Sequence, residues 1–301
     1  MVVLTTNSQT ITLSVVPSAD AFVIAREPTN NYGGAGASSV SGSAGTNADG
    51  QLNGAADSLA RFPMSNLVSS ADAALGTHDW LVTHATLRVY EMGAPPHPIF
   101  SRGVGQFEVR WIVNDSWIEG TGIPSMPTQD GVSWKDLSLI LEPSIDQTLG
   151  FFTNTGADGP LSFDLALIPA LVSDIRSGTE VGMYFTAASP EIGFTFDSRT
   201  FVVPSEQPRL EITAASQPIV RIDSIKLTNA NFVSIGFNTL SNWNYTLQAA
   251  NGTNGLVSDS WVNLLTVVGQ TSTGHVEYVD GLTNGQRAYR LNLTPSFPAT
   301  F

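Results

Sequence analysis

Histidines and carboxylates are the residues of this 301-residue chain that could carry acid–base or metal chemistry. The four histidines are His78, His84, His97 and His275, and none of their spacings is that of a zinc site. The chain has no cysteine, and no strand is followed by a nucleophile elbow, a phosphate loop or a dinucleotide-binding glycine motif. We therefore predict that the protein is not an enzyme. A polysaccharide lyase or hydrolase remains a weak third alternative. A glycosidase needs two carboxylates close together, but among 26 acidic residues chance pairs are certain, so such pairs do not point to catalysis.

Aromatic side chains in or near predicted loops are the strongest candidates for ligand contact. Sugar-binding β-sandwiches place flat rings against pyranose faces, and a histidine ring can take part. The candidates are Tyr32, Trp80, His97, Trp117 and Trp134. Packing in the core is the more common role of any single tryptophan, so both interpretations stay open.

Four arginines flanked by apolar strand residues also have two interpretations; they are Arg61, Arg88, Arg199 and Arg209. In an acidic domain such side chains pair with nearby carboxylates, for example Glu119 or Asp197, across the sheet. The guanidinium fork would equally fit the carboxylate of a uronate, and Arg88 is our candidate for that contact. Structural pairing is the favoured interpretation.

Oxygen-bearing side chains in turns provide the one metal alternative. Asp20, Asn30, Asn47 and Asp49 offer carboxylate and amide oxygens, which suit calcium. The favoured interpretation is that these side chains accept hydrogen bonds from the backbone of their own turns. We expect no cofactor, with a structural calcium ion as the only metal considered.

The charge distribution argues against several classes of partner. Residues 1–215 carry 9 basic and 22 acidic side chains, whereas residues 216–301 carry 4 of each, which accounts for the net charge of −13. An acidic surface repels phosphate backbones, so we expect no nucleic-acid partner. No apolar run approaches the ~18 residues of a membrane span. The polar surface is rich in Ser, Thr and Asn, which is typical of extracellular or cell-surface β-proteins, although no signal peptide is visible at the N-terminus.

Short apolar stretches with a two-residue alternation predict β-strands along the first two thirds of the chain. Strands are expected at 10–15, 85–90, 106–113, 181–187, 192–196 and 209–213. A helix is expected at 165–175 and a short helical turn within 65–76. The Gly- and Ser-rich segment 33–54 is predicted to be a loop that packs no core. The proline-containing segment 93–103 is predicted to be a loop, because proline rules out a central strand. This pattern predicts an antiparallel sandwich.

A composition change near residues 214–218 predicts a boundary between domains 1–214 and 215–301. Six further strands are expected, at 219–227, 231–237, 244–249, 261–268, 275–279 and 287–293. Asn-Gly pairs between them supply turn chemistry. Their number and spacing predict a small immunoglobulin- or fibronectin-like sandwich.

Several segments in order resemble the DNRLRE family, a group of secreted bacterial and archaeal jelly-roll domains that includes alginate-binding modules. The matching segments are Pro17–Val23, Asn31–Gly33, Ser58–Phe62, Ala85–Tyr90, Asp115–Gly120, Phe196–Arg199 and Pro208–Ile212. Pro63 stands where the family usually carries an aspartate. Residues 245–248, 260–264, 279–280 and 288–291 resemble a small sandwich that ends many secreted planctomycete and verrucomicrobial proteins. The resemblance implies a jelly roll that binds polysaccharide.

We therefore predict an all-β protein, a jelly-roll sandwich followed by a smaller immunoglobulin-like sandwich. The predicted function is non-catalytic polysaccharide binding at the cell surface or outside the cell. The alternative is a structural subunit of a surface layer, appendage or extracellular fibre, whose partners are neighbouring copies of itself. In that case residues 4–15 would form an exposed strand that adds to a neighbouring sheet.

Overall fold

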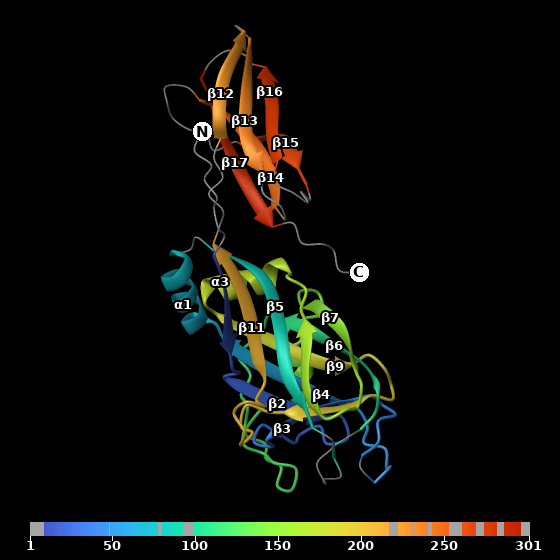
Figure 1. The fold of residues 1–301 in the computed structure, drawn as a ribbon. Helices are drawn as coiled ribbons and strands as arrows, with labels where there is room; N and C mark the ends of the chain where they lie inside the picture. Colours follow the sequence, from blue (N-terminus) through green and yellow to red (C-terminus); the bar gives the residue numbers. More distant parts are fainter. Residues whose placement is uncertain are drawn as a thin grey trace. The chain divides into compact units, whose positions relative to one another are not determined.

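A computed structural model describes residues 9–47, 49–77, 80–92, 99–100, 102–216, 222–229, 231–239, 243–252, 261–268, 274–281 and 286–295. Two compact units divide the chain, with a boundary between Gln217 and Pro218. Antiparallel strands dominate both (Figure 1), which confirms the predicted all-β fold class. Within the described ranges, no helix is both long and apolar enough to cross a membrane.

The larger unit is built from eleven antiparallel strands, three short α-helices and one 3-10 turn. The strands are β1 (Thr10–Val15), β2 (Ala19–Ile24), β3 (Ala37–Ser41), β4 (Ala56–Pro63), β5 (Trp80–Glu91), β6 (Gly105–Ile112), β7 (Gln147–Asn154), β8 (Gly159–Asp164), β9 (Glu180–Ala187), β10 (Gly193–Asp197) and β11 (Arg209–Ser216). The helical segments are α1 (Ser65–Leu75), η1 (Trp134–Asp136), α2 (Leu137–Ile140) and α3 (Pro169–Ser177). The hydrogen-bonded order is β1-β11-β5-β10-β3-β4-β9-β6-β7, with β2 on β4 and β8 on β5.

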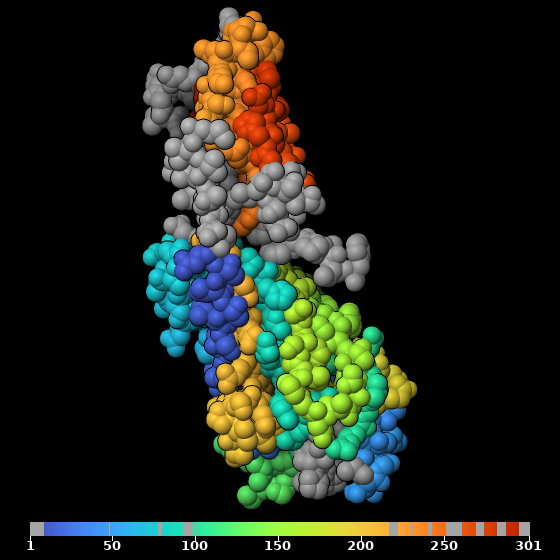
Figure 2. Space-filling view, viewed as in Figure 1, coloured from blue at the N-terminus to red at the C-terminus, as the bar shows by residue number. Residues whose placement is uncertain are grey.

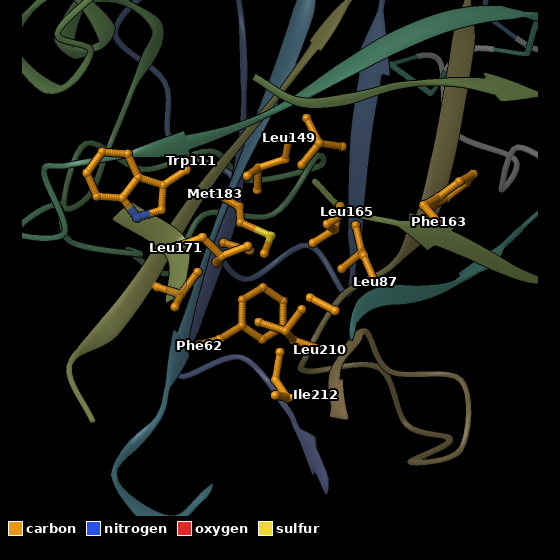
Figure 3. Packing of buried hydrophobic residues seen from close by; sticks show 14 of the residues in the cluster. Phe62, Leu87, Trp111, Leu149, Phe163, Leu165, Leu171, Met183, Leu210 and Ile212 are labelled. Carbon is orange, nitrogen blue, oxygen red and sulfur yellow. The ribbon is translucent and has the colours of Figure 1, made fainter. Parts of the chain in front are cut away.

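The main core of this unit is formed by side chains of strands from both ends of that hydrogen-bonded order. Alternation along each strand turns one set of apolar side chains inward. Phe62 of β4, Leu87 of β5, Trp111 of β6, Met183 of β9 and Leu210 of β11 are all buried in it (Figure 3). Full burial of each such side chain stabilises the fold by roughly 1.5–3 kcal/mol.

The first and last strands of the unit, β1 and β11, pair with each other, and β11 also pairs with β5. Thr10 of β1 lies opposite Ala215 of β11, and Leu210 of β11 lies opposite Leu87 of β5. The three strands lie side by side on one surface (Figure 2). The strands predicted at 10–15, 85–90 and 209–213 are therefore confirmed, as are those at 106–113, 181–187 and 192–196 within a residue or two.

The prediction that residues 33–54 pack no core was wrong. Residues 37–41 form β3, whose five residues are all buried between β10 and β4. The strand is made of Ala, Ser and Val, and small side chains let two neighbouring layers approach it. The backbone of Ser39 is hydrogen-bonded across to β4, since Ser58 Oγ donates to Ser39 O and accepts from Ser39 N.

The predicted helices are confirmed with shifted bounds. α3 begins at Pro169 rather than at residue 165, because proline suits the first turn, where no backbone donor is needed. It ends at Gly178, which has the left-handed φ of 76°. α1 buries Leu67, Ala71 and Leu75 on one face and packs beside β1.

The smaller unit consists of two three-stranded antiparallel sheets. Its strands are β12 (Ile222–Asn229), β13 (Phe232–Thr239), β14 (Trp243–Gly252), β15 (Val262–Val267), β16 (Gly274–Gly281) and β17 (Gln286–Pro295). One sheet has the order β12-β13-β16 and the other β15-β14-β17. Ile235 and Phe237 of β13 and Tyr245 and Leu247 of β14 are fully buried. The six predicted strands are confirmed within three residues at each end, except that residues 219–221 of the first lie outside the described residues.

Two glycines with nearly the same positive φ provide a test of packing in the larger unit. Gly120 (φ 79°) lies against Asn31, and a Cβ there would stand 2.2 Å from Asn31 Oδ1; a Cβ on Gly50 (φ 76°) would meet nothing within 4 Å. We expect Gly120→Ala to cost about 2 kcal/mol in the free energy of unfolding and Gly50→Ala about 1 kcal/mol. Equal losses on denaturant unfolding would contradict the close packing at Gly120.

Candidate functional site

Three segments far apart in the sequence meet in a buried ion-pair cluster. Glu119 accepts hydrogen bonds from the backbone N–H of Asp20 (3.1 Å) and from Arg199 Nε (2.6 Å), and Arg199 Nη2 also bonds its second oxygen. Asp20 Oδ2 in turn accepts the backbone N–H of Arg199. The predicted pairing of Arg199 with Glu119 is confirmed. These contacts join residues 17–23, 115–120 and 196–199, so the cluster is structural.

Burial makes the Asp20 carboxyl a weaker acid than an exposed aspartate. Asp20 is only 2% exposed, and this desolvation raises its pKa from 3.8 to about 7, against the lowering effect of its bond from the Arg199 backbone. Glu119 adds a like charge nearby, which acts in the same direction as burial.

The calcium candidates are not brought together. Asn30 Nδ2 donates to Glu27 and to the hydroxyl of Tyr32, whereas Asn47 Oδ1 accepts the backbone N–H groups of Asp49 and Gln51. The favoured interpretation of Asn47, a side chain that closes its own turn, is therefore confirmed. In the described part of the chain, no group of three or more His, Asp or Glu side chains could hold a metal ion.

Three of the predicted ligand-contacting aromatics lie in the core, which corrects the expectation that they bind sugar. Tyr32 is 1% exposed and stacks on Phe22, with ring centroids 4.9 Å apart. Trp80 is fully buried and its Nε1 donates to Asp72. Trp117 is 5% exposed and packs beneath the guanidinium of Arg61, at 4.8 Å. All three side chains are at most 5% exposed, so none presents an open ring face to a pyranose. His97 lies outside the described residues.

The other arginines also pair within the protein. Arg88 Nε lies 2.7 Å from Glu211 on the neighbouring strand, so the favoured interpretation, a cross-strand ion pair, is confirmed for Arg88. Arg61 Nη1 lies 3.3 Å from Glu180 Oε2, and Arg209 donates to the carbonyl of Pro204.

A cavity of about 210 Å³ lies over one end of β4 and β9, and it is the candidate functional site. Asp57 of β4 and Thr186 of β9 line it together with Trp134. The remaining lining residues are small or rigid: Ser41, Gly42, Ser43, Ala55, Ala187, Ala188, Ser189 and Pro190. The rim is held by backbone bonds, because Gly42 N donates to Ile192 O and Ala44 N to Pro190 O.

Trp134 is the one predicted aromatic that remains partly open. It begins the short turn η1, where Ser133 and Asp136 form a capping box that fixes the backbone, and Lys135 N donates to Pro28 O. The indole is half-buried and packs against the apolar cluster beneath it. The Trp134 side chain therefore both lines the cavity and packs against the apolar cluster, which holds the ring in place.

Cross-strand register extends the site beyond the cavity. β4, β9, β6 and β7 follow one another in the sheet (Figure 1). Asp57 hydrogen-bonds Thr186, which lies opposite Glu108 of β6, and Glu108 lies opposite Phe151 of β7. Neighbouring strands are about 4.8 Å apart, so this cross-strand row (Asp57, Thr186, Glu108, Phe151) is about 15 Å long. It ends on Phe151, whose side chain is 61% exposed.

The cavity is electrically negative. Asp57 is 5% exposed and accepts the hydroxyl of Tyr184; burial raises its pKa from 3.8 to about 6, and the bonds from Tyr184 and Thr186 lower it less. None of the described residues that line the cavity is basic. Along the row, Arg110 Nε is 3.8 Å from Glu108, but Arg110 Nη2 already donates to the carbonyl of Asp146.

A second, larger cavity of about 480 Å³ is lined by Asn114, Ser116, Trp117, Ile118, Gln129, Asp130, Gly131, Val132, Asp136, Leu139 and Ile140. Two of its apolar side chains, Ile118 and Leu139, are 67% and 76% exposed. This surface is therefore less polar than the Asp57 cavity.

No protein-family model matches the sequence, and no curated protein matches it. Solved structures that align with the fold include the two that follow. The Macrobrachium rosenbergii nodavirus structure is 10% identical, with 97% of this chain and 93% of that chain covered and a TM-score of 0.25. The glycoside hydrolase domain of Endo-D from Streptococcus pneumoniae R6 is 12% identical, with 95% of this chain and 37% of that chain covered and a TM-score of 0.14. Likenesses at these TM-scores assign no function, so the function is argued from the site.

Proposed function

We propose that this protein is a non-catalytic polysaccharide-binding protein that works outside the cell or at the cell surface. The observation that carries the proposal is the cavity that the partly exposed Trp134 lines together with the hydrogen-bonding side chains of Asp57 and Thr186. Binding sites for small polar molecules combine an apolar wall with a few fixed polar groups.

The cross-strand row gives a chain-like ligand a surface to follow. From Asp57 it passes Thr186 and Glu108 and reaches the exposed ring of Phe151. Aromatic surface at both ends, with acceptors between them, suits an extended molecule that has apolar faces and polar edges. A polysaccharide has this character.

The DNRLRE resemblance supports the same class of ligand. The segments that carry the resemblance include 17–23, 115–120 and 196–199, which meet at the Asp20–Glu119–Arg199 cluster. In this proposal those residues hold the sandwich together, and the ligand lies elsewhere, on the outer side of β4, β9, β6 and β7.

Trp134→Ala is expected to weaken polysaccharide binding at least tenfold. A tryptophan at the centre of a contact commonly contributes 2 kcal/mol or more, and 1.4 kcal/mol is a factor of ten. Affinity electrophoresis of the full chain through gels that contain different polysaccharides identifies a bound polymer, and calorimetry with its oligomers then measures the dissociation constant.

Trp261→Ala in the smaller unit is the matched control, since it removes the same ring where it packs against Arg290, 4.1 Å away. We expect no change in binding for this variant. Unchanged binding by Trp134→Ala would contradict the proposed site. Release of new reducing ends from the bound polymer would contradict the non-catalytic assignment.

A structural subunit is the second candidate, and the exposed apolar side chains around the larger cavity favour it. Ile118 and Leu139, with Met126 at 68% exposure, present apolar surface that a neighbouring copy could bury. Filaments in negative stain that lengthen with protein concentration, and that Leu139→Asp abolishes, are the expected result for this alternative.

A further inference from the structure

We propose that the cavity beside Trp134 selects an amine-bearing sugar, so that the bound polysaccharide is a polymer of amino sugars with free, protonated amines. This inference rests on the proposed function, because it names the ligand class of the same cavity. The structural basis is the buried Asp57 carboxylate that lines the cavity, which has hydrogen-bond donors but no basic residue among the described residues that line the cavity with it.

The hydrogen bonds at Asp57 orient the carboxylate without neutralising it. Tyr184 Oη donates to Asp57 Oδ2, and Thr186 donates through its hydroxyl. A carboxylate has about four lone-pair sites, so two donors leave acceptor capacity that faces the cavity. An ammonium group placed there would make charge-assisted bonds, which are roughly twice as strong as neutral ones.

The negative charge of Asp57 in the cavity is one that an ammonium group of the ligand would neutralise. Burial without a neighbouring cation raises the pKa of Asp57 to about 6. A ligand ammonium would supply the missing positive charge and favour the ionised carboxylate. A neutral sugar hydroxyl could donate to Asp57 but would leave its charge uncompensated.

The surrounding charges disfavour an acidic polymer. Glu108 lies one strand beyond Thr186 along the row, and its nearest cation, Arg110, is shared with the Asp146 carbonyl. A uronate in the cavity would face Asp57 and Glu108, and none of the described residues that line the cavity is basic. Residues 1–215 also carry a net charge of −13, from 9 basic and 22 acidic side chains, which repels polyanions at longer range.

The test compares three hexasaccharides against the unaltered full chain by calorimetry, at a pH above the pKa of about 6 of Asp57, so that its carboxylate is ionised. The three are hexamers of glucosamine, N-acetylglucosamine and a uronate. We expect the glucosamine hexamer to bind at least tenfold more tightly than the acetylated one, and the uronate not to bind. Because this comparison uses no variant, it does not depend on whether any substitution folds.

Variants then locate the effect. Asp57→Asn is expected to weaken the glucosamine hexamer at least tenfold and the acetylated hexamer less than twofold. Asp49→Asn is the matched control, since it removes the same charge at an exposed position and should leave binding unchanged. Attraction between a cationic sugar and an acidic surface in general would weaken equally in both variants, and that result would overturn the proposal.

The remaining outcomes separate the two claims. If the acetylated or the uronate hexamer binds as tightly as the glucosamine hexamer and Trp134→Ala abolishes that binding, the amine selectivity is wrong and the proposed function stands. If none of these oligomers and no polysaccharide in the electrophoresis panel binds, both are overturned.

Discussion

Replacing Glu119 by alanine is expected to destabilise the larger unit by about 3–5 kcal/mol, because it leaves a partly buried guanidinium without its partner. Glu119 accepts bonds from the Asp20 backbone and from two nitrogens of Arg199, and its side chain is only 15% exposed. At about 2–4 °C per kcal/mol for a unit of this size, the melting temperature should fall by roughly 6–20 °C. Calorimetric melting of the full chain measures this.

Glu211→Ala is the control for that loss. It also removes the carboxylate of an arginine pair, but Arg88 is 54% exposed and stays hydrated. Exposed pairs contribute about 0–1 kcal/mol, so the melting temperature should change by only a few degrees. Equal melting temperatures for the two variants would contradict a stabilising role for the cluster that joins residues 20, 119 and 199.

The larger unit is expected to be more stable at pH 5 than at pH 8. Buried carboxyls with a folded-state pKa of about 6 or 7 and an unfolded value near 4 are Asp20, Asp57, Glu91, Asp115 and Asp197. Between those values the folded state keeps a proton that the unfolded state has released, so stability falls as pH rises until the folded group ionises. Asp57 alone contributes about 1.4 kcal/mol to the difference between pH 5 and pH 8.

Melting curves at pH 5, 6, 7 and 8 check this, and Asp57→Asn should show a smaller decrease between pH 5 and pH 7. The exposed Asp130 acts in the opposite direction, since bonds from Thr121 and Thr128 lower its pKa to about 2. Its contribution is lost only below about pH 4, outside this window. A melting temperature that rises from pH 5 to pH 8 would contradict the protonated state of the buried carboxyls.

Alternation was enough to predict strands whose outward residues are polar, such as β1, β6 and β11. It failed for β3, where all five residues are buried and the small Ala and Ser side chains resemble a loop. It also missed β7 and β8, which are interrupted by Gly150 and Pro160. Burial of small residues depends on what packs over them, and a single sequence does not contain that information.

The site was predicted only in part. Trp134 was among the expected ligand residues and lines the cavity, but Asp57, Thr186 and Glu108 were missed. These three come from strands distant in the sequence, and only the register of β4, β9 and β6 places them in one row. Tyr32 and Trp80 could not be separated from Trp134 beforehand, because residue type does not reveal which side of a strand or loop faces the core.

The pairing of β1 with β11 bears on whether this unit could serve in a stretched fibre. Because the strands are antiparallel and Thr10 lies opposite Ala215, the chain enters and leaves the unit at the same end of the pair, where Gln9 and Ser216 also bond each other. Tension applied through these two connections would break the hydrogen bonds between β1 and β11 one after another, instead of loading all of them at once in shear. We therefore expect the unit to open at a lower force than one whose terminal strands are loaded in shear.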